Sequence, residues 1–558
     1  MNNQVDGQVD GRAGVPGIVT RVADRIGVDP IVLGMVAFFV AHMLIRLFGT
    51  SNFSVDDTET AVHTQVFQLY YSLRNPPLFN WLYFGLSEVF GSNLITMQIL
   101  KTALLIAAGW FFYSAIRPAF RHREALYAAI VSYGATAYYG WDVFQQFSHT
   151  ITLIFSMGFT LWAFMRLLRR AHTVDFVVLG VGLGLGIMSK YLFGLYFVAL
   201  VIAALRSPSY RAALLSWRLL LTIIVALIVV SPLLIGLYDV MTSVFATVGG
   251  RVAGSGNGFD IASLGSLVLL TAMFWLPFLA ILAVGLYRWP ASEAGNAQSP
   301  PDALLGEGDD DFYRLVRDAT LIMFAAVLAA VLFLGTRISG VRYLIAVLSL
   351  LPVAVFVAID RKLPFPALAL RNFQRGAVAF IVGIAVIRFL IFLFISPPFC
   401  IPRCVLFVDY TPVVERLGTA DGKQNVILSN HVHIASNLLR QVPNARVVMD
   451  TYTAGSDLGI VGPADRNCYF VWFRKYRDHD PVPFEAALEQ ALRRLPLDSE
   501  RAAVESVESV TAKWQTNLLW DWGPDTIIGI ATLDSATPIC AGGRIPGLSP
   551  PPSGNSKQ

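Results

Sequence analysis

Long apolar stretches separated by short polar loops dominate residues 29–397. Each stretch approaches the roughly 18 to 25 residues that a helix needs to cross the hydrocarbon core of a bilayer. Lipid offers no hydrogen-bond partner to a bare backbone amide, so we expect these stretches to be helices. They predict about eleven spans by this length criterion, near residues 31–49, 94–116, 124–140, 149–168, 174–188, 191–206, 215–238, 264–287, 316–335, 342–359 and 376–396.

The composition supports an integral membrane protein. Of the 558 residues, 55% are hydrophobic and 14% are charged, whereas soluble proteins are about 25% charged. The net charge of +4 is small and gives no indication of nucleic acid binding. Residues 1–28 are polar and Gly-rich, and they predict a disordered tail with no cleavable signal peptide.

The positions of Arg and Lys predict the orientation of the spans, because basic loops stay on the cytoplasmic side. Every second loop is basic; examples are Arg12, Arg21 and Arg25 before the first span and Arg117, Arg121 and Arg123 after the second. The N-terminus is therefore expected in the cytoplasm. An odd number of spans then places the C-terminal part on the opposite side of the membrane, so we expect a multi-pass membrane protein with an external C-terminal domain.

Composition changes abruptly after the last span, and residues 398–545 predict a small α/β domain. Segments 424–429, 445–449, 468–473 and 526–532 are typical of strands, and 434–440 is typical of a helix. All four cysteines, Cys400, Cys404, Cys468 and Cys540, lie here. They indicate disulfides formed in an oxidising compartment, with the pairing left open, although ordinary buried thiols are the alternative. Residues 546–558 predict a second disordered tail.

The first external loop, residues 50–92, carries the main candidates for chemistry. Asp56 and Asp57 open a stretch, 58–73, that has helical spacing. A carboxylate here could remove a proton from an attacking hydroxyl, whereas the alternative is a helix cap that accepts backbone hydrogen bonds. The rigid Pro76-Pro77 turn and the aromatic residues after it predict a helix lying at the membrane interface.

A few cations in the outward loops could bind a phosphate, because phosphate oxygens accept strong, charge-assisted hydrogen bonds from Arg and Lys. They are Arg74, Lys190, Arg251, Arg337 and Arg342. Lys190 interrupts a long apolar region; it either contacts phosphate or marks a turn between two spans and reaches to water. The sequence leaves open whether Lys101, inside the second span, reaches to the interface or lines a cavity.

Nothing in the sequence indicates a cofactor or a metal centre. Glycines 180, 182, 184 and 186 recur at a spacing of two, unlike a nucleotide-binding loop, and they favour close packing of helices. No P-loop is present, and the cysteines have no histidine partners at the spacing of a zinc site.

Three motifs resemble those of the bacterial dolichyl-phosphate-mannose protein mannosyltransferase-like enzymes of glycosyltransferase family 39, within the GT-C superfamily that also contains the lipid A aminoarabinose transferases. The motifs are Asp56-Asp57-Thr58-Glu59 with Leu73–Leu82 and Phe90-Gly91, the Gly-rich segment Gly182–Tyr191, and Val341-Arg342-Tyr343-Leu344. The resemblance covers roughly residues 31–360. It implies a GT-C-like membrane protein with about 11 to 13 transmembrane helices and a small C-terminal α/β domain.

The resemblance also implies an activity: inverting transfer of a sugar from a polyprenyl-phosphate donor to a lipid, glycan or protein acceptor at the periplasmic face. Lipid A or lipopolysaccharide is one such acceptor, and membrane lipid surrounds the donor. The catalytic base of the family maps onto Asp56 or Asp57, and Lys190 and Arg342, with Arg74, are the candidates for binding the donor phosphate.

This sequence departs from the family pattern at two points. Asp56-Asp57 replaces the commoner Asp-Glu, with Glu59 two residues later, and His149 stands where many relatives carry an Asp. Asp142 is the nearby carboxylate that could compensate. Candidates for acceptor contact or for support of the site are Glu59, Asp142, His149, Tyr191 and Tyr343.

Two other function classes remain open at this point. A transporter or flippase of lipid-linked sugars would show related halves and charged or helix-breaking residues near the middle of the membrane. The sequence has no clear internal repeat, and its informative polar residues gather on one side. A scaffold for polymer assembly without catalytic activity is the third reading.

Overall fold

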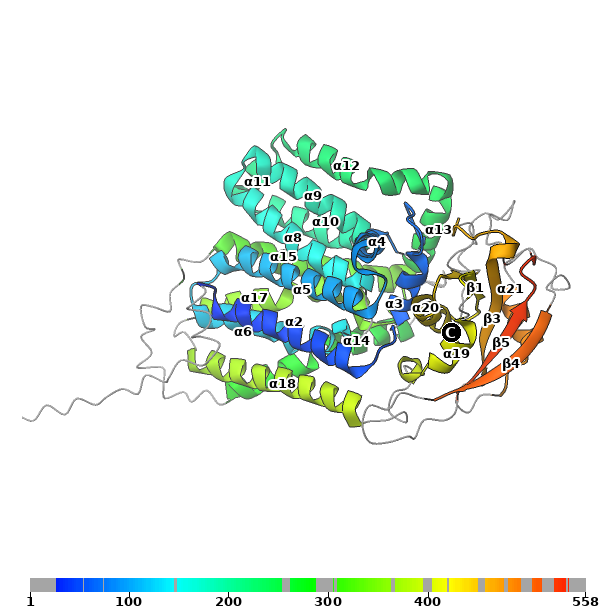
Figure 1. The fold of residues 1–558 in the computed structure, drawn as a ribbon. Coiled ribbons are helices and arrows are strands. Elements are labelled where there is room, and N and C mark those ends of the chain that lie inside the picture. Colours follow the sequence, from blue (N-terminus) through cyan, green and yellow to red (C-terminus); the bar gives the residue numbers. More distant parts are fainter. Residues whose placement is uncertain are drawn as a thin grey trace, which may run out of the picture.

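The computed structural model describes most of the 558-residue chain. The described ranges are 27–53, 55–73, 75–144, 148–252, 261–287, 305, 309–362, 367–394, 404–418, 421–449, 457–475, 480–492, 504–513, 526–537 and 540. The tail predicted for 546–558, almost all of the tail predicted for 1–28, and Arg74 lie outside the described residues. A large helical bundle is joined to a smaller domain built on a five-stranded sheet (Figure 1).

The predicted apolar stretches form helices at nearly the expected places. They are α2 (Pro30–Gly49), α5 (Leu94–Ile116), α6 (Arg123–Gly134), α8 (Ser148–Arg170), α9 (Thr173–Ser189), α10 (Phe193–Leu205), α12 (Leu219–Leu237), α14 (Ile261–Tyr287), α15 (Asp310–Leu334), α17 (Leu351–Asp360) and α18 (Ala367–Phe394). In the described part of the chain, seven helices are long and apolar enough to cross a membrane; α10 and α11 (Pro208–Leu214), bent by 119°, could form an eighth span. The predicted polytopic helical fold is confirmed. The seven or eight described helices that meet this criterion are fewer than the roughly 11 to 13 predicted.

Two predicted spans are shorter than expected. The span predicted for 124–140 ends at Gly134 and continues as the short helix α7 (Ala137–Gly140). The chain doubles back there, and a Cβ on Gly140 would lie 2.4 Å from the carbonyl oxygen of Gly134. The span predicted for 342–359 is broken into a 3₁₀ turn η6 (Val341–Tyr343), α16 (Ile345–Leu348) and α17, because Pro352 starts a new helix.

The alternating glycines of α9 allow close helix packing, as predicted. A Cβ on Gly180 would lie 2.7 Å from the carbonyl oxygen of Thr222, and one on Gly184 would lie 2.5 Å from the side chain of Val229. Both neighbours belong to α12, so α9 and α12 pack with their backbones close together. The absence of a side chain at these positions has a packing role.

The C-terminal domain contains a sheet with the strand order β2-β1-β3-β5-β4. Its strands are β1 (Gln424–Leu428), β2 (Ala445–Val448), β3 (Arg466–Lys475), β4 (Val504–Ala512) and β5 (Thr526–Leu533), and its helices are α19 (Thr411–Leu417), α20 (Val432–Gln441) and α21 (Phe484–Leu492). Strands β1, β2 and β3 are parallel, whereas β5 and β4 are antiparallel additions. Four strands and α20 confirm the predictions from the sequence. Strand β4 was not predicted, because it is an exposed edge strand without a buried apolar face.

A disulfide joins Cys468 on β3 to Cys540, with a Cα–Cα distance of 5.9 Å. This confirms a disulfide for one pair of the four cysteines. The side chains of Cys400 and Cys404 lie outside the described residues.

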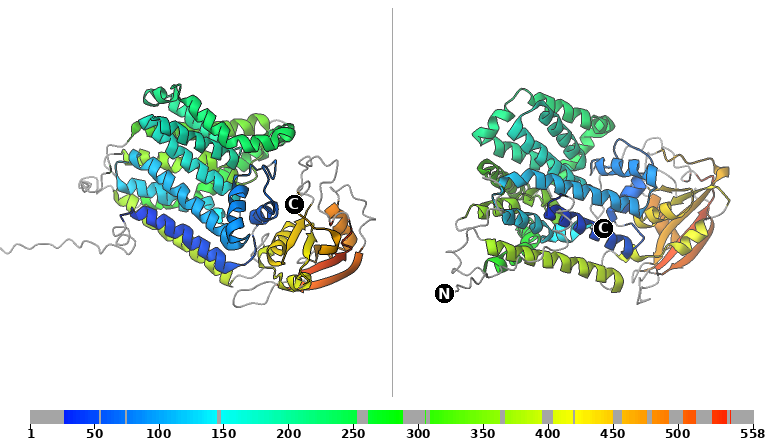
Figure 2. Two further views of the ribbon diagram at one scale, coloured as in Figure 1. Left: turned by 45° about the horizontal axis from the view of Figure 1, so that its top comes forward. Right: turned by 60° about the vertical axis from the view of Figure 1, so that its left-hand side comes forward.

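The C-terminal domain packs against one end of the helical bundle, where the first external loop lies (Figures 1 and 2). This loop contains two helices, α3 (Val55–His63) and α4 (Leu78–Phe90). Helix α3 lies between the bundle and α20 of the C-terminal domain. The remaining short helix is α13 (Met241–Val252), which follows α12.

Candidate active site

Helix α3 carries the acidic pair and is shorter than the sequence predicts. Helical spacing predicts a helix over 58–73, but α3 ends at His63. The following residues bond to other parts of the molecule: Trp81 Nε1 donates to the carbonyl of Gln68 over 2.8 Å, and the Gln65 side chain bonds to the C-terminal domain. These tertiary bonds replace the hydrogen bonds that would extend the helix.

The segment after the two prolines forms α4, which confirms the predicted helix. Leu78, Phe79 and Asn80 are buried at its start. The Asn80 Nδ2 atom lies 3.5 Å from Nδ1 of His63, the last residue of α3. Helix α4 therefore braces the C-terminal end of α3.

Asp57 is completely buried and forms an ion pair with Lys101, which is 7% exposed and belongs to α5. The hydroxyl of Ser148, at the start of α8, donates to the same carboxylate oxygen over 3.0 Å. Asp57 thus ties α3 to two helices of the bundle. The sequence left the role of Lys101 open, and the structure makes it the partner of Asp57.

Asp56 is only half-buried and lies within electrostatic range of three cations, Arg342, Lys101 and Lys190. Burial raises the pKa of Asp56 to about 6, and the neighbouring Asp57 acts in the same direction, whereas the three cations oppose the shift. A carboxylate with a pKa near 6 is ionised at neutral pH and still basic enough to accept a proton in a transition state.

Lys190 follows the last residue of α9, at the turn into α10, as one of the two alternatives predicted. Its Nζ atom donates to Thr150 Oγ1 of α8 over 2.7 Å. Lys190 is therefore held toward Asp56 and is only partly exposed. The neighbouring residue of the predicted set, Tyr191, donates from its hydroxyl to the carbonyl of Leu73 over 3.5 Å.

Arg342 lies in η6 beside Tyr343. Its guanidinium is 5.2 Å from the centre of the Tyr343 ring, and its Nη2 atom is 3.4 Å from the Tyr343 hydroxyl. The aromatic contact fixes a long side chain that would otherwise have many rotamers. The structure therefore brings together four predicted residues from distant parts of the chain, namely Asp56, Asp57, Lys190 and Arg342.

The other predicted residues lie on several different elements, and their assignment does not depend on a contact with Asp56. Glu59 lies one turn after Asp56 on α3, and Asp142 lies in the 3₁₀ turn η2 (Asp142–Phe144). Both Asp56 and Asp142 lie within electrostatic range of Tyr138. His149 is buried in the first turn of α8, with Phe79 against its ring. Arg337 is exposed, and the side chain of Arg251 lies outside the described residues.

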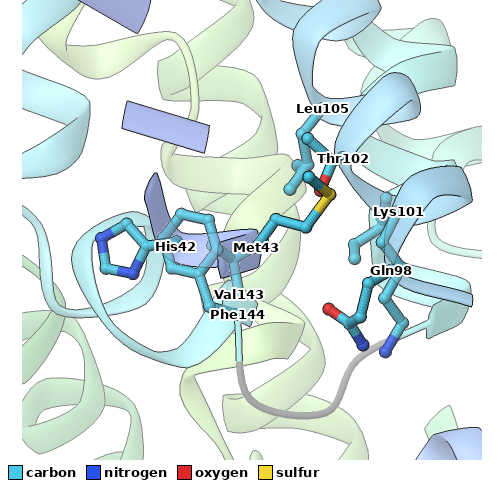
Figure 3. Close-up of a pocket in the computed structure, with 9 residues that line it drawn as sticks. His42, Met43, Gln98, Lys101, Thr102, Leu105, Val143 and Phe144 are labelled. Carbon is cyan, nitrogen blue, oxygen red and sulfur yellow. The ribbon is translucent and has the colours of Figure 1, made fainter. Parts of the chain in front are cut away.

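A small cavity adjoins Lys101 on the side facing α2 (Figure 3). Its polar lining comes from Gln98, Lys101 and Thr102 of α5 and from His42 of α2. Arg388 of α18 donates to His42 Nδ1 over 3.1 Å and to the carbonyl of Phe144 over 2.8 Å. Our reading of the sequence missed His42 and Arg388, although a charged residue inside the apolar run 376–396 is a signal that could have found Arg388.

No group of three or more His, Cys, Asp or Glu side chains within the described ranges is arranged to hold a metal ion. The prediction that no metal is needed therefore stays a prediction. The described site has one ion-paired carboxylate, a second carboxylate nearby and several cations. This arrangement suits proton transfer beside a phosphate group.

Comparison with known proteins shows similarity to membrane glycosyltransferases. The profile of the dolichyl-phosphate-mannose-protein mannosyltransferase family matches residues 74–235. The crystal structure of ArnT from Cupriavidus metallidurans bound to undecaprenyl phosphate aligns with 91% of this chain and 99% of its own, with a TM-score of 0.54 and 13% identity. The apo form of ArnT gives a TM-score of 0.52 over 91% of this chain and 98% of its own, also at 13% identity.

In sequence and in fold, this chain is similar to the membrane glycosyltransferases of the GT-C superfamily. Among curated proteins, it is similar to the lipopolysaccharide core galacturonosyltransferase RgtB of Rhizobium johnstonii, with 25% identity over 75% of this chain and 82% of the relative. It is also similar to RgtA of the same organism, with 30% identity over 36% of this chain and 40% of that relative. The structural likeness confirms the expected GT-C fold with its C-terminal domain.

Proposed function

We propose that this protein is an inverting glycosyltransferase that transfers a sugar from a polyprenyl-phosphate donor to lipopolysaccharide at the periplasmic face of the inner membrane. The observation that carries the proposal is the position of Asp56, which lies beside Asp57 and within electrostatic range of Arg342, Lys101 and Lys190. Two comparisons support the choice of ligands: the ArnT structure is bound to undecaprenyl phosphate, and RgtB is named for transfer to the lipopolysaccharide core.

Asp56 is the proposed base, and Asp57 holds α3 in place. Asp57 is buried against Lys101, so a proton placed on it would break an ion pair. Asp56 has partial access to solvent, and within the part of the chain that the structure describes it forms no ion pair at the distance of the Asp57–Lys101 pair. This difference supports Asp56 rather than Asp57 as the base, whereas the sequence left the two as equal candidates.

In the proposed reaction, an acceptor hydroxyl attacks the anomeric carbon of the donor sugar as Asp56 takes its proton. A new carbon–oxygen bond forms on one face of the sugar, and the bond to the phosphate oxygen breaks on the other face. The electron pair of the broken bond leaves with the polyprenyl phosphate. Lys190 and Arg342 stabilise the negative charge that develops on this leaving group.

The proposed sugar is a hexuronic acid, the class that the name of RgtB indicates. Of the three cations within electrostatic range of Asp56, Lys101 forms the ion pair with Asp57, and Lys190 and Arg342 are the proposed contacts of the anionic donor. A uronic acid carboxylate is compatible with these contacts, because arginine and lysine both bind carboxylates well.

The proposed orientation has the N-terminus in the cytoplasm and the active site with the C-terminal domain in the periplasm. The disulfide between Cys468 and Cys540 supports an oxidising environment for that domain. The alternating basic loops support the same orientation.

The test is transfer of a radiolabelled sugar from undecaprenyl phosphate to purified lipopolysaccharide core, by the purified protein in lipid vesicles. Asp56→Asn should lower kcat by about 10²- to 10⁴-fold, the usual contribution of a positioned base. Glu88→Gln, which changes an exposed carboxylate on α4, should leave kcat unchanged. Labelled galacturonate should be transferred at least about tenfold faster than labelled galactose.

The pH dependence provides an independent check. Because Asp56 must be ionised to act as a base and its pKa is raised to about 6, the rate should fall as the pH drops below about 6. Activity that persists in Asp56→Asn would contradict the assignment. A transporter or flippase would move the lipid-linked sugar across the vesicle without forming a glycosidic bond.

A further inference from the structure

The C-terminal domain forms hydrogen bonds with the chain just before α3. The Asn52 Nδ2 atom donates to the carbonyl oxygens of Leu406 and Val408 over 3.0 and 2.7 Å. The backbone amide of Phe53 donates to Asn437 Oδ1 of α20 over 3.0 Å. Asn52 and Asn437 are 1% and 0% exposed, so these bonds are shielded from water.

The same domain forms hydrogen bonds with the chain again just after α3. The Gln65 side chain forms a reciprocal pair with Val447, the third residue of edge strand β2: its Oε1 accepts from the Val447 amide over 2.8 Å, and its Nε2 donates to the Val447 carbonyl over 3.1 Å. Val62, within α3, is fully buried in the apolar core of the C-terminal domain. The first external loop therefore supplies both hydrogen bonds to Val447 at the edge of the sheet.

Helix α3 depends on these contacts for its position. It has nine residues, fewer than the roughly 12 to 15 at which an isolated helix becomes marginally stable in water. The bundle holds it through Asp57, bonded to Lys101 and Ser148. The C-terminal domain holds it at both ends. Each buried hydrogen bond contributes about 0.5 to 1.5 kcal/mol, and leaving one partner unsatisfied costs about 1 to 3 kcal/mol.

We infer that the C-terminal domain holds the helix that carries Asp56 in its catalytic position. Gln65 is the positioning residue that fixes Asp56 relative to the cations of the bundle. The inference rests on the proposed function, in which Asp56 is the base. Misplacement of a catalytic group by about 1 Å can lower a rate by about 100-fold. The Gln65 contact, nine positions after Asp56 in the sequence, can therefore control turnover without touching either substrate.

Positioning of Asp56 and recognition of the acceptor by the C-terminal domain would have different effects on the kinetic constants. A domain that binds the acceptor would change KM for the acceptor when it is altered. A domain that positions the base would change kcat and leave both KM values nearly constant. It would also change the pH profile, because burial is the main cause of the raised pKa of Asp56. A loosened α3 exposes that carboxylate to water, so the acid limb of the profile moves to lower pH.

The experiment compares Gln65→Leu, Gln65→Glu and a matched control in the complete protein. Gln424 provides the control, because its side chain also makes one donated and one accepted hydrogen bond to the backbone, here inside the C-terminal domain. It donates to the carbonyl of Gly459 over 3.2 Å and accepts from the amide of Val461 over 3.0 Å. Gln424→Leu should keep the wild-type kcat, since Gln424 does not contact the first external loop.

Gln65→Leu should lower kcat at least about tenfold, with both KM values within about twofold of the wild type. Gln65→Glu keeps the acceptor for the Val447 amide and should recover part of the lost rate. The acid limb should lie at lower pH in Gln65→Leu than in the wild type. A wild-type kcat for Gln65→Leu, a loss confined to KM, or an equal loss in Gln424→Leu would overturn the inference.

Asp56→Asn separates failure of this inference from failure of the proposed function. If Asp56→Asn is inactive and Gln65→Leu is fully active, the positioning role is wrong and the catalytic proposal stands. If Asp56→Asn is as active as the wild type, the catalytic proposal fails and the inference fails with it.

Discussion

Removing the cation from the buried ion pair gives the most direct test of how α3 is anchored. In Lys101→Met, the carboxylate of Asp57 stays at 0% exposure without its charged partner, while Ser148 still donates a neutral hydrogen bond. Loss of one partner of a buried ion pair costs about 3 to 5 kcal/mol. Because the hydrogen bond from Ser148 to the carboxylate remains, we expect a loss near the lower end, about 3 kcal/mol.

A double-mutant cycle separates the pair from the rest of the site. Asp57→Asn alone leaves Lys101 buried without a counter-charge, whereas Lys101→Met combined with Asp57→Asn removes both charges. The double variant should be more stable than the sum of the single effects predicts, with a coupling free energy of about 2 to 3 kcal/mol. Equilibrium unfolding in mixed detergent micelles measures each free energy of unfolding.

An exposed ion pair provides the control for this cycle. Arg314 and Asp311 lie three residues apart on α15, with side chains 60% and 21% exposed. Their coupling free energy should be about 0.5 kcal/mol or less. If the effects of Lys101→Met and Asp57→Asn add without coupling, as in this control, the pair does not anchor α3 and the reasoning is refuted.

Three further predictions concern other parts of the molecule. Lys190→Met should raise KM for the polyprenyl-phosphate donor by about 10- to 100-fold, because a hydrogen bond to a charged group contributes about 1.5 to 3 kcal/mol; an unchanged donor KM would remove Lys190 from the phosphate site. Replacing Cys468 and Cys540 by Ser should destabilise the C-terminal domain by about 4 kcal/mol, because the disulfide closes a separation of 72 residues; thermal unfolding with and without reductant measures this. Gly158→Ala should cost about 1 to 3 kcal/mol, since its Cβ would lie 2.7 Å from the carbonyl oxygen of Ala108 and force α5 and α8 apart; a wild-type melting temperature would contradict this packing.

The sequence alone was sufficient for the class of fold and for most of the candidate residues. Apolar length predicts spans because the bilayer sets a fixed thickness for every one of them. The doublet Asp56-Asp57 and the cation Lys190 stand out because each interrupts or borders an apolar run, where charge is costly. Strands β1 and β3 are recognisable for a related reason, since consecutive residues in both are apolar and buried.

Only the tertiary structure decided how these residues divide their roles. Lys101 lies 44 positions from Asp57 in another helix, and no local pattern links the two. The early end of α3 depends on Gln65 bonding to a strand 382 positions away. Such contacts depend on how separate helices and domains pack, and neither apolar periodicity nor residue spacing encodes that packing. The sequence therefore predicts the acidic pair, and the fold determines which of the two carboxylates is anchored by an ion pair.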